Sequence, residues 1–332
     1  MKAFVTGGTG VVGKAFLPRL AQAGYEITAL TRDPRKADLP RDVRITYVAG
    51  NLDAPETVAG LFSTPAAYDV IFHLAASLEY FGDVEKMSAL NAGGTATMAR
   101  FARHAGAQRF VHASSIEAAG GFAGRAIPAA PGDVGRVIST YGESKRAAEA
   151  AALALNASGL PAISLRIGNV YGDGWPNFVV EFADAILQRN RLAEFLPIYA
   201  GRYWSPVHND DVSAGLLAAA GSSHTGLCNL VGQAATVGEI FQMCASAVGV
   251  HFAPGPWRLT DWLYVHATTR YFRRFRHFDT LAYLAVPTWP YVHRCFGMEE
   301  SSRALAWSPS VALRLGIERT IRWAREAGLL RF

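Results

Sequence analysis

Short apolar runs rich in β-branched residues alternate with longer helical segments over the first half of the chain. Segments 13–23, 92–105 and 143–157 have the composition and length of helices. Nearly continuous apolar strands separated by helices pack as a parallel sheet that is covered on both faces. The pattern therefore predicts an α/β fold, a doubly wound parallel Rossmann sheet. The strand candidates are "KAFV" (2–5), "EITAL" (26–30), "RITYV" (44–48), "DVIFHL" (69–74), "RFVHA" (109–113), "AISLR" (162–166) and, later in the chain, "LCNLV" (227–231).

This regularity ends after about residue 172, where loops rich in glycine, proline and aromatic residues begin. We therefore expect a dinucleotide-binding Rossmann domain over 1–172, to which 205–232 returns. A smaller C-terminal substrate-binding lobe is expected from 173–204 and 233–332. In an open α/β sheet, ligands bind beyond the carboxyl ends of the strands, so functional residues should follow the predicted strands.

The stretch "GGTGVVGKA" follows the first strand and contains two overlapping glycine spacings. One is the phosphate-loop spacing G-x-x-x-x-G-K, which ends at Lys14. That motif needs a Ser or Thr hydroxyl for magnesium after its lysine, and Ala15 has none. The other spacing, Gly7, Gly10 and Gly13, is a variant of the dinucleotide-binding turn, which brings backbone N–H groups to a pyrophosphate. The second interpretation is favoured.

The second strand ends in "ALTRDPRKA", with Thr31 and Arg32 at the point where NAD-binding enzymes place an acid. Arg35 and Lys36 follow closely. An arginine at this point pairs with the 2′-phosphate of NADP, whereas an acid binds the ribose 2′-hydroxyl of NAD. The sequence thus favours NADP(H) over NAD(H); a solvated basic turn is the alternative.

Tyr141 and Lys145 in "TYGESK" are four residues apart, which puts both side chains on one helix face. A nearby lysine stabilises a phenolate, so we expect the pKa of Tyr141 to be lowered from about 10 and the residue to act as a general acid or base. A strand ends in Ser114 and Ser115, 26 residues before Tyr141, and Ser115 is placed to bond the same substrate oxygen. The alternatives are a surface Tyr–Lys pair and a helix N-cap.

These motifs resemble the extended short-chain dehydrogenases/reductases, the NAD-dependent epimerase/dehydratase group, over almost the whole chain. The resemblance implies a catalytic set of Ser115, Tyr141 and Lys145. It also implies a supporting Asn91, which holds either the active-site geometry or a proton-relay water. The residues that carry it are "TGGTGVVG", "FHLAA" (72–76), "NAGGTATMARFARHAGAQRFVHASS" (91–115), "YGESK", "LRIGNVYG" (165–172), "SPVHNDDVSAG" (205–215) and "GIERTIRWAREAGLL".

The same resemblance implies where the cofactor lies. Asn51 stands where the family usually has an adenine-binding Asp, and His208 and Asp211 match a motif to which we assign a structural role. Ala118-Ala119-Gly120 replaces a frequent Val-Tyr-Gly, which widens the pocket near the nicotinamide. The cofactor-binding residues implied are Gly7, Thr9, Gly10, Val11, Val12, Gly13, Arg32, Asn51, Leu52, Leu74, Ala75, Ala76, Ala113, Tyr141, Lys145, Ile167, Gly168 and Val170.

Three functions remain open for such a chain. The first is an NADP(H)-dependent ketone reductase or secondary-alcohol dehydrogenase, as in the hydroxysteroid-dehydrogenase-like and dihydroflavonol-reductase-like branches. The second is a nucleotide-sugar epimerase or dehydratase with tightly held NAD(P), and the third is a non-catalytic NADP-binding protein. The family's dehydratases carry Thr-Asp-Glu where this chain has Ser115, Ile116 and Glu117, and Arg202 is displaced from the usual diphosphate-binding position. Asn169, at the family's substrate-amide position, keeps the sugar interpretation open.

Aromatic residues are dense in the predicted substrate lobe, which suits an apolar ketone or alcohol, although most aromatics of a protein are packing. Candidate substrate contacts are Glu117, Asn169, Tyr203 and Trp204. The segment 257–291 mixes aromatic residues with arginines and is compatible with a lid, a subunit contact, a basic surface helix or contact with a membrane surface. The aromatic residues of the lobe are Trp175, Phe178, Tyr199, Tyr203, Trp204, Trp257, Trp262, Tyr264, Tyr271, Phe272 and Phe275.

Composition narrows the class of protein further. Of the 332 residues, 50% are hydrophobic and 18% are charged, which indicates a compact globular protein and no nucleic-acid partner. The three cysteines lack the paired spacing of metal ligands, so no metal is predicted. We recognise no signal peptide and no apolar run of the ~20 residues that span a membrane. A cytoplasmic enzyme is expected, as a homodimer if it follows the family.

Overall fold

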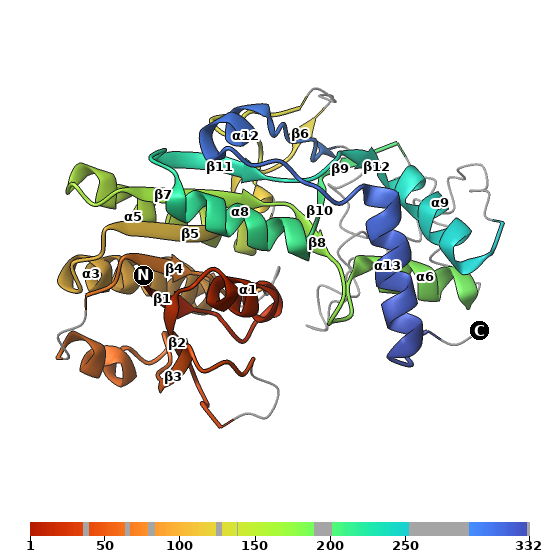
Figure 1. Ribbon diagram of the computed structural model, residues 1–332. Coiled ribbons are helices and arrows are strands. Elements are labelled where there is room, and N and C mark those ends of the chain that lie inside the picture. The colour runs from red at the N-terminus through yellow and green to blue at the C-terminus, as the bar shows by residue number, and fades with distance from the viewer. Residues whose placement is uncertain are drawn as a thin grey trace.

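A seven-stranded parallel sheet forms the centre of the protein (Figure 1). The computed structural model describes residues 1–35, 40–63, 67–78, 84–123, 128–137, 139–188, 201–251 and 292–330. The strand order is β11-β7-β5-β4-β1-β2-β3, and every neighbouring pair is parallel, so the predicted doubly wound α/β fold is confirmed. The strands are β1 (Lys2–Thr6), β2 (Glu26–Thr31), β3 (Ile45–Ala49), β4 (Val70–His73), β5 (Arg109–Ser115), β7 (Ala162–Ile167) and β11 (Gly226–Leu230).

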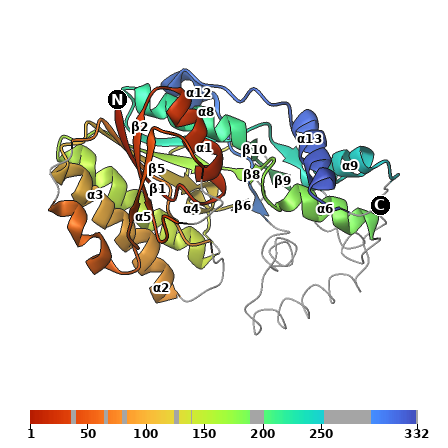
Figure 2. The ribbon, with the colours of Figure 1, turned by 60° about the horizontal axis from the view of Figure 1, so that its bottom comes forward.

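Helices cover both faces of this sheet (Figure 2). Successive strand residues point to opposite faces, so Phe4 packs with Met98 and Phe101 on one side while Val5 packs with Phe16 on the other. Because both faces are buried, the central strands are largely apolar, which explains the runs seen in the sequence. One face is covered by α1 (Val11–Gln22) and α8 (Asn209–Gly221), the other by α3 (Gly94–His104) and α5 (Thr140–Ala157).

A smaller lobe has an apolar core of its own, made by three helices that lie beside the sheet in Figure 1. The alternation of strands and helices did not indicate these helices. Local signals do, since α9 begins with a capping box in which Thr236 and Glu239 bond each other's backbone N–H groups. Within the described part of the lobe, these helices are α6 (Phe178–Leu187), α9 (Val237–Val248) and α13 (Leu313–Glu326).

Late segments of the chain return to the Rossmann core. Leu305 and Trp307, at the end of α12 (Glu299–Leu305), belong to the core that α1 and α8 share with the sheet, although their range was assigned to the lobe. Short strand pairs make further joins, β8 with β10, β9 with β12 and β6 with β13. The remaining elements are η1 (Pro55–Phe62), α2 (Val84–Ser88), η2 (Ala89–Gly93), α4 (Ile116–Ala119), β6 (Phe122–Ala123), β8 (Asn169–Tyr171), β9 (Tyr203–Trp204), β10 (Pro206–His208), β12 (Ala235–Thr236) and β13 (Val292–His293).

Asp211, in the first turn of α8, holds the segment that leads into α13. Its Oδ1 accepts hydrogen bonds from the backbone N–H and the hydroxyl of Ser310, both at 2.8 Å, and its Oδ2 accepts from the N–H of Val311 at 3.1 Å. The side chain of His208 caps α8 by accepting from the N–H of Asp210 at 3.2 Å. The structural role predicted for His208 and Asp211 agrees with these contacts.

Two predictions concern the membrane and the aromatic segment. Among the described residues, no helix combines the length and the apolar character needed to cross a membrane. The segment 257–291, with its proposed lid, subunit or membrane-surface contact, lies outside the described residues, as do Lys36 and Tyr199.

We predict that Asp211→Asn lowers the free energy of unfolding by about 1–3 kcal/mol, because the amide replaces one of the two accepting oxygens with a donor and so removes a charge-assisted hydrogen bond to the Ser310–Val311 backbone. The matched control is Asp210→Asn, which changes the neighbouring, partly exposed carboxylate. This control should cost less than about 1 kcal/mol, as expected for an exposed ion pair. Urea unfolding measures both variants, and equal losses would contradict the anchoring role of Asp211.

Candidate active site

A cavity of about 840 Å³ lies beyond the carboxyl ends of the central strands. Its wall includes the ends of β1, β4, β5 and β7 and the first turns of α1 and α5. The volume falls in the upper part of the roughly 300–1,000 Å³ range of small-molecule sites. The cavity is therefore at the place where doubly wound sheets bind their ligands.

The glycine turn brings the N-terminus of α1 against this cavity. Gly7 has a φ of +71°, and a Cβ on it would come within 2.5 Å of the backbone N of Ala75. A Cβ on Gly13 would collide with the backbone oxygen of Gly7. Only glycine leaves room for this close approach, by which Val11 and Val12 reach the cavity wall in the first turn of the helix. The cradle suits the pyrophosphate of a dinucleotide.

All of the cofactor-binding residues predicted from the sequence line this one cavity. Arg32 is exposed and lines the cavity, as does the acid Asp53, whereas Asp33, the neighbour of Arg32 in the chain, does not line it. The Asp33 carboxylate accepts hydrogen bonds from the backbone N–H and Nε of Arg35, at 3.0 and 3.4 Å. The positive charge of Arg32 thus faces the ligand space, while Asp33 is engaged in its own turn. The amide oxygen of Asn51 is also engaged locally, with the N–H of Asp53 at 3.2 Å.

Ser115, Tyr141 and Lys145 meet on one wall of the cavity. Ser115 ends β5 and caps α4, where its Oγ accepts from the N–H of Glu117 at 3.2 Å. It also forms a side-chain hydrogen bond with Tyr141. Tyr141 and Lys145 come from the first two turns of α5, whose start is capped by Ser139. The N-cap role of Ser115 and its contact with Tyr141 are thus present together.

The predicted lowering of the pKa of Tyr141 is wrong, because the pKa is raised. Burial raises the pKa of Tyr141 well above its usual value; the hydrogen bond from Ser115 opposes this, and the Glu117 carboxylate adds to it. The Lys145 ammonium is bonded to the backbone oxygen of Ala113 at 2.7 Å, and burial lowers the pKa of Lys145 to about 8, against the opposing charge of Glu149. Tyr141 therefore keeps its proton.

Asn91 is buried and does not line the cavity. Its Oδ1 accepts from the N–H of Ser77 at 2.8 Å, and its Nδ2 donates to the Ser77 oxygen at 3.1 Å and to Ser144 Oγ at 2.9 Å. These contacts join the loop after β4 to α5. Of the two roles that were open for Asn91, they correspond to holding the geometry of the site.

The end of the cavity next to Ser115 is largely apolar and was only partly foreseen. Asn169 lines it, and its Oδ1 is buried without a hydrogen-bond partner among the described residues, which leaves an acceptor for a ligand. Tyr203 does not line the cavity and lies against His293 instead, with ring centroids 5.9 Å apart. The apolar wall consists of Ile116, Trp175, Pro176, Phe178 and Trp204.

Glu117 lies in the cavity wall, but its carboxylate is bonded to a buried arginine. Arg294 Nε donates to Glu117 Oε1 at 2.8 Å and Nη2 to Oε2 at 3.4 Å, and both side chains are at most 4% exposed. Sequence reasoning missed Arg294, which is 177 residues away and carries no local motif. Because Arg294 already binds both oxygens of the Glu117 carboxylate, a substrate would have to compete with Arg294 for this side chain.

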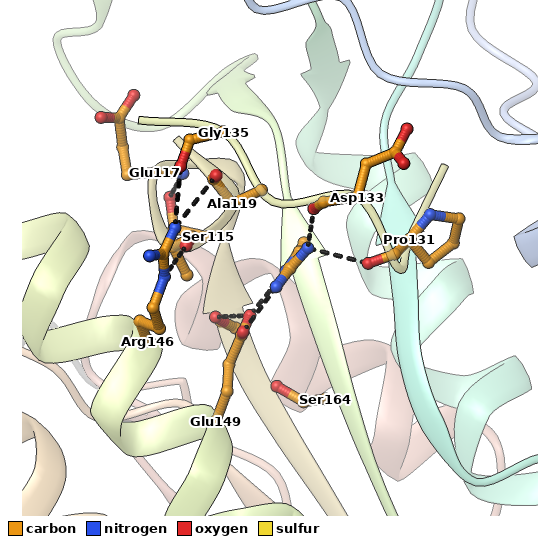
Figure 3. Close-up of polar contacts among 12 residues, drawn as sticks. Ser115, Glu117, Ala119, Pro131, Asp133, Gly135, Arg146, Glu149 and Ser164 are labelled. Atoms are coloured by element: carbon orange, nitrogen blue, oxygen red, sulfur yellow. Dashed lines mark hydrogen bonds and ion pairs between the residues drawn. The ribbon is translucent and has the colours of Figure 1, made fainter. Parts of the chain in front are cut away.

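A second network of polar contacts is built around Arg146 and Glu149 of α5 (Figure 3). Arg146, next to Lys145 in α5, donates to the backbone oxygens of Ala118, Ala119 and Gly135 at 2.8–3.2 Å. Arg166 of β7 and Ser114 both donate to Glu149 at 2.7–2.9 Å. These bonds fix α5 to α4, β5 and β7. Their available signal was an arginine in the otherwise apolar run "AISLR".

The Rossmann sheet, the dinucleotide turn and the Ser-Tyr-Lys wall together define an extended short-chain dehydrogenase/reductase. The model of the NAD dependent epimerase/dehydratase family matches residues 3–229, so the chain belongs to that family. Its members are nicotinamide-dependent, and the chain's curated relatives include reductases and dehydrogenases.

Two curated relatives are oxidoreductases by name. The 4-hydroxy-2-methyl-3-oxo-4-farnesyl-3,4-dihydroquinoline-1-oxide ketoreductase of Stigmatella aurantiaca is 30% identical over 222 residues, 66% of this chain and 64% of the relative. The 3-beta-hydroxysteroid dehydrogenase of Mycolicibacterium neoaurum is 30% identical over 186 residues, 52% of this chain and 48% of the relative. The chain thus spans less than two thirds of the length of each.

Among solved structures, the UDP-glucose 4-epimerase of Thermus thermophilus in complex with NAD has the same fold. The TM-score is 0.74 at 23% identity, and the alignment covers 98% of this chain and 100% of the epimerase. At this identity the likeness establishes the fold and no more.

We predict that Arg294→Met lowers the free energy of unfolding by about 3–5 kcal/mol, since it leaves the Glu117 carboxylate buried without its counter-ion. The double variant Arg294→Met/Glu117→Gln removes that stranded charge, so it should be more stable than Arg294→Met alone. Urea unfolding of these two variants and of Glu117→Gln gives the interaction free energy between Arg294 and Glu117. Strictly additive losses would show that the pair does not interact.

Proposed function

We propose that the chain is an NADP(H)-dependent ketone reductase, or in reverse a secondary-alcohol dehydrogenase, with an apolar substrate. The observation that carries the proposal is the position of the Ser115–Tyr141 hydrogen bond. It lies in the wall of the cofactor cavity, next to Ile116 in the chain, and Trp175 and Trp204 line the same cavity. A proton donor thus meets apolar surface where a carbonyl compound can lie. The relatives named as ketoreductase and hydroxysteroid dehydrogenase support the same class of substrate.

Tyr141 supplies the proton in the reductive direction. When bound, the nicotinamide dinucleotide supplies the reducing equivalents. The substrate carbonyl oxygen accepts hydrogen bonds from Ser115 and Tyr141, and Tyr141 gives its proton to the developing alkoxide. Burial, which raises the pKa of Tyr141, keeps that proton available until the substrate oxygen becomes basic. Ser115 Oγ accepts the Glu117 N–H, and its hydroxyl proton, which serves the bond with Tyr141, is proposed to turn to the substrate oxygen when a carbonyl compound is bound.

Lys145 serves the cofactor and the tyrosine. It lines the cavity, and its bond to the Ala113 oxygen fixes the ammonium at the wall. Once Tyr141 has released its proton, the nearby positive charge stabilises the phenolate. Arg32, which follows β2 and lines the same cavity, is proposed to pair with a 2′-phosphate and so to select NADP(H).

A nucleotide-sugar epimerase is the second candidate, and the free Oδ1 of Asn169 is the observation that favours it, because it can accept a bond from a polar substrate. Two features argue against it: the Glu117 carboxylate is bonded to Arg294, and part of the cavity wall is apolar. Ile116, which stands in place of the dehydratases' acid, argues against a dehydratase. A panel of ketones, secondary alcohols and nucleotide sugars separates the two: a reductase consumes NADPH, whereas an epimerase shows no net change in absorbance.

We predict that Tyr141→Phe lowers kcat for the best ketone of that panel by about 10²–10⁴-fold, the usual contribution of a positioned acid. The Kd for NADPH should stay within about threefold, because the hydroxyl serves the substrate and not the cofactor. The matched control is Tyr25→Phe, a buried tyrosine at the start of β2 that does not line the cavity. Full activity of Tyr141→Phe would refute the mechanism.

We predict that Arg32→Asp raises the Kd for NADPH by about 10- to 100-fold, since it removes charge-assisted bonds to the 2′-phosphate and adds repulsion. The Kd for NADH should change little. Arg100→Asp makes the same change of charge on the exposed side of α3 and should leave both constants unaltered. Fluorescence titration gives the ratio of the Kd for NADPH to the Kd for NADH. If this ratio stays at the wild-type value in Arg32→Asp, the assignment of Arg32 to the 2′-phosphate is excluded.

A further inference from the structure

Four polar side chains form a row across the buried face of the sheet that α3 and α5 cover. In the strand register, Thr6 pairs with His73, His73 with His112, and His112 with Ser164. All four are fully buried, while the residues two positions earlier on the same strands are apolar core. Buried polar groups need hydrogen-bond partners, so each member of the row has to be accounted for.

The half of the row around His73 is a closed set of bonds. Thr95 donates its hydroxyl to the backbone oxygen of Asn91 at 2.6 Å, so its oxygen accepts from His73 Nε2, at 3.0 Å. His73 Nδ1 then accepts from the Thr6 hydroxyl at 2.7 Å. The ring is neutral, because burial and the charge of Lys145 lower the pKa of His73 to about 3. Through Thr95, at the start of α3, these bonds connect η2 to the sheet.

The other half ends on the catalytic lysine. His112 Nε2 is 3.4 Å from Lys145 Nζ, and His112 Nδ1 is 2.9 Å from Ser164 Oγ. An ammonium group has only N–H donors, so Nε2 is the acceptor and Nδ1 carries the ring proton and donates it to Ser164. Burial, with the charge of Lys145, holds the pKa of His112 well below its usual value, so the ring stays neutral.

We propose that His112 is a positioning residue for the proposed reaction: its Nε2 is the second internal acceptor that holds the Lys145 ammonium, in its charged form, at the cavity wall. The proposal rests on the proposed function, in which Lys145 serves the cofactor and Tyr141. Two of the three ammonium N–H groups are directed to Ala113 and His112, which leaves the third for the cavity that Lys145 lines.

The titratable groups around Lys145 are few. His73 and His112 face it from β4 and β5, and Tyr141 and Glu149 belong to its own helix. Both imidazoles are neutral, and Tyr141 keeps its proton because its pKa is raised. Burial lowers the pKa of Lys145 to about 8, so within this set it is the group that titrates above neutral pH. Its charged form is present below that pH and is lost as the pH rises through it.

Two amide variants separate the two nitrogens of the ring. Gln at position 112 reaches the place of Nε2 and offers Lys145 an acceptor, whereas Asn reaches only the place of Nδ1 and keeps the contact with Ser164. The readouts are the Kd for NADPH and kcat/KM for the ketone, each measured from about pH 6 to 10, where the lysine changes charge. His73→Asn, in the same buried row but without a bond to Lys145, is the control for packing.

We predict that His112→Asn moves the alkaline inflection of both profiles to lower pH by about one unit, as the loss of a bond to a charged group implies. His112→Gln should return the inflection to near the wild-type pH. His73→Asn should lower Tm without moving the inflection. Equal shifts in His112→Asn and His112→Gln, or no shift in either, would overturn the positioning role.

The two readouts keep this proposal separate from the proposed function. The binding profile needs no substrate, so a chain that reduces none of the ketones still reports the charge of Lys145 through the Kd for NADPH. If the inflection moves as predicted in binding while no ketone turns over, the reductase proposal fails and the role of His112 stands. If ketones are reduced but neither His112 variant moves the profile, the role of His112 fails alone.

Discussion

A buried lysine ammonium governs the polar arrangement of this active site. Lys145 is about 1% exposed, so it has lost nearly all of its hydration, and an ammonium in such a place is tolerated only with well-placed acceptors. The backbone oxygen of Ala113 supplies one at 2.7 Å. The imidazole of His112 contributes another at 3.4 Å. The polar pair of His112 and Ser164 in the centre of the sheet, which would otherwise weaken an apolar core, is explained by this requirement.

The position of the cavity depends on how closely helices and strands approach each other at the carboxyl edge of the sheet. Gly7 and Gly13 let α1 begin directly behind β1, with no space for a Cβ against Ala75 or against the turn itself. On the other side, Arg146 binds α4 and α5 together through backbone oxygens. The gap between these two fixed walls is the cavity, and its ends carry Arg32 and the apolar surface around Trp204.

Local patterns in the sequence were enough to predict the sheet and most of the cavity wall. The strand runs, the glycine spacing and the Tyr141–Lys145 pair are each defined within a few neighbouring residues, and each forms an element or turn of the predicted type. The pKa of Tyr141 was mispredicted because burial, which raises it, depends on the packing of the whole wall. Asn91 has the predicted place in the chain, but whether its side chain faces a ligand or Ser144 depends on how η2 packs on α5.

Contacts between segments far apart in the chain could not be predicted, because no local sequence pattern indicates them. Arg294 meets Glu117 because β13 pairs with β6 and brings the late chain back beneath the site, a path that no local periodicity describes. The consequence reaches the chemistry. A carboxylate next to the catalytic serine would otherwise be free to act as a base or to bind a polar substrate, and the guanidinium engages both of its oxygens. The wall of the cavity that includes Glu117 thus behaves as an internally neutral surface, which suits an apolar carbonyl compound better than a charged diphosphate sugar.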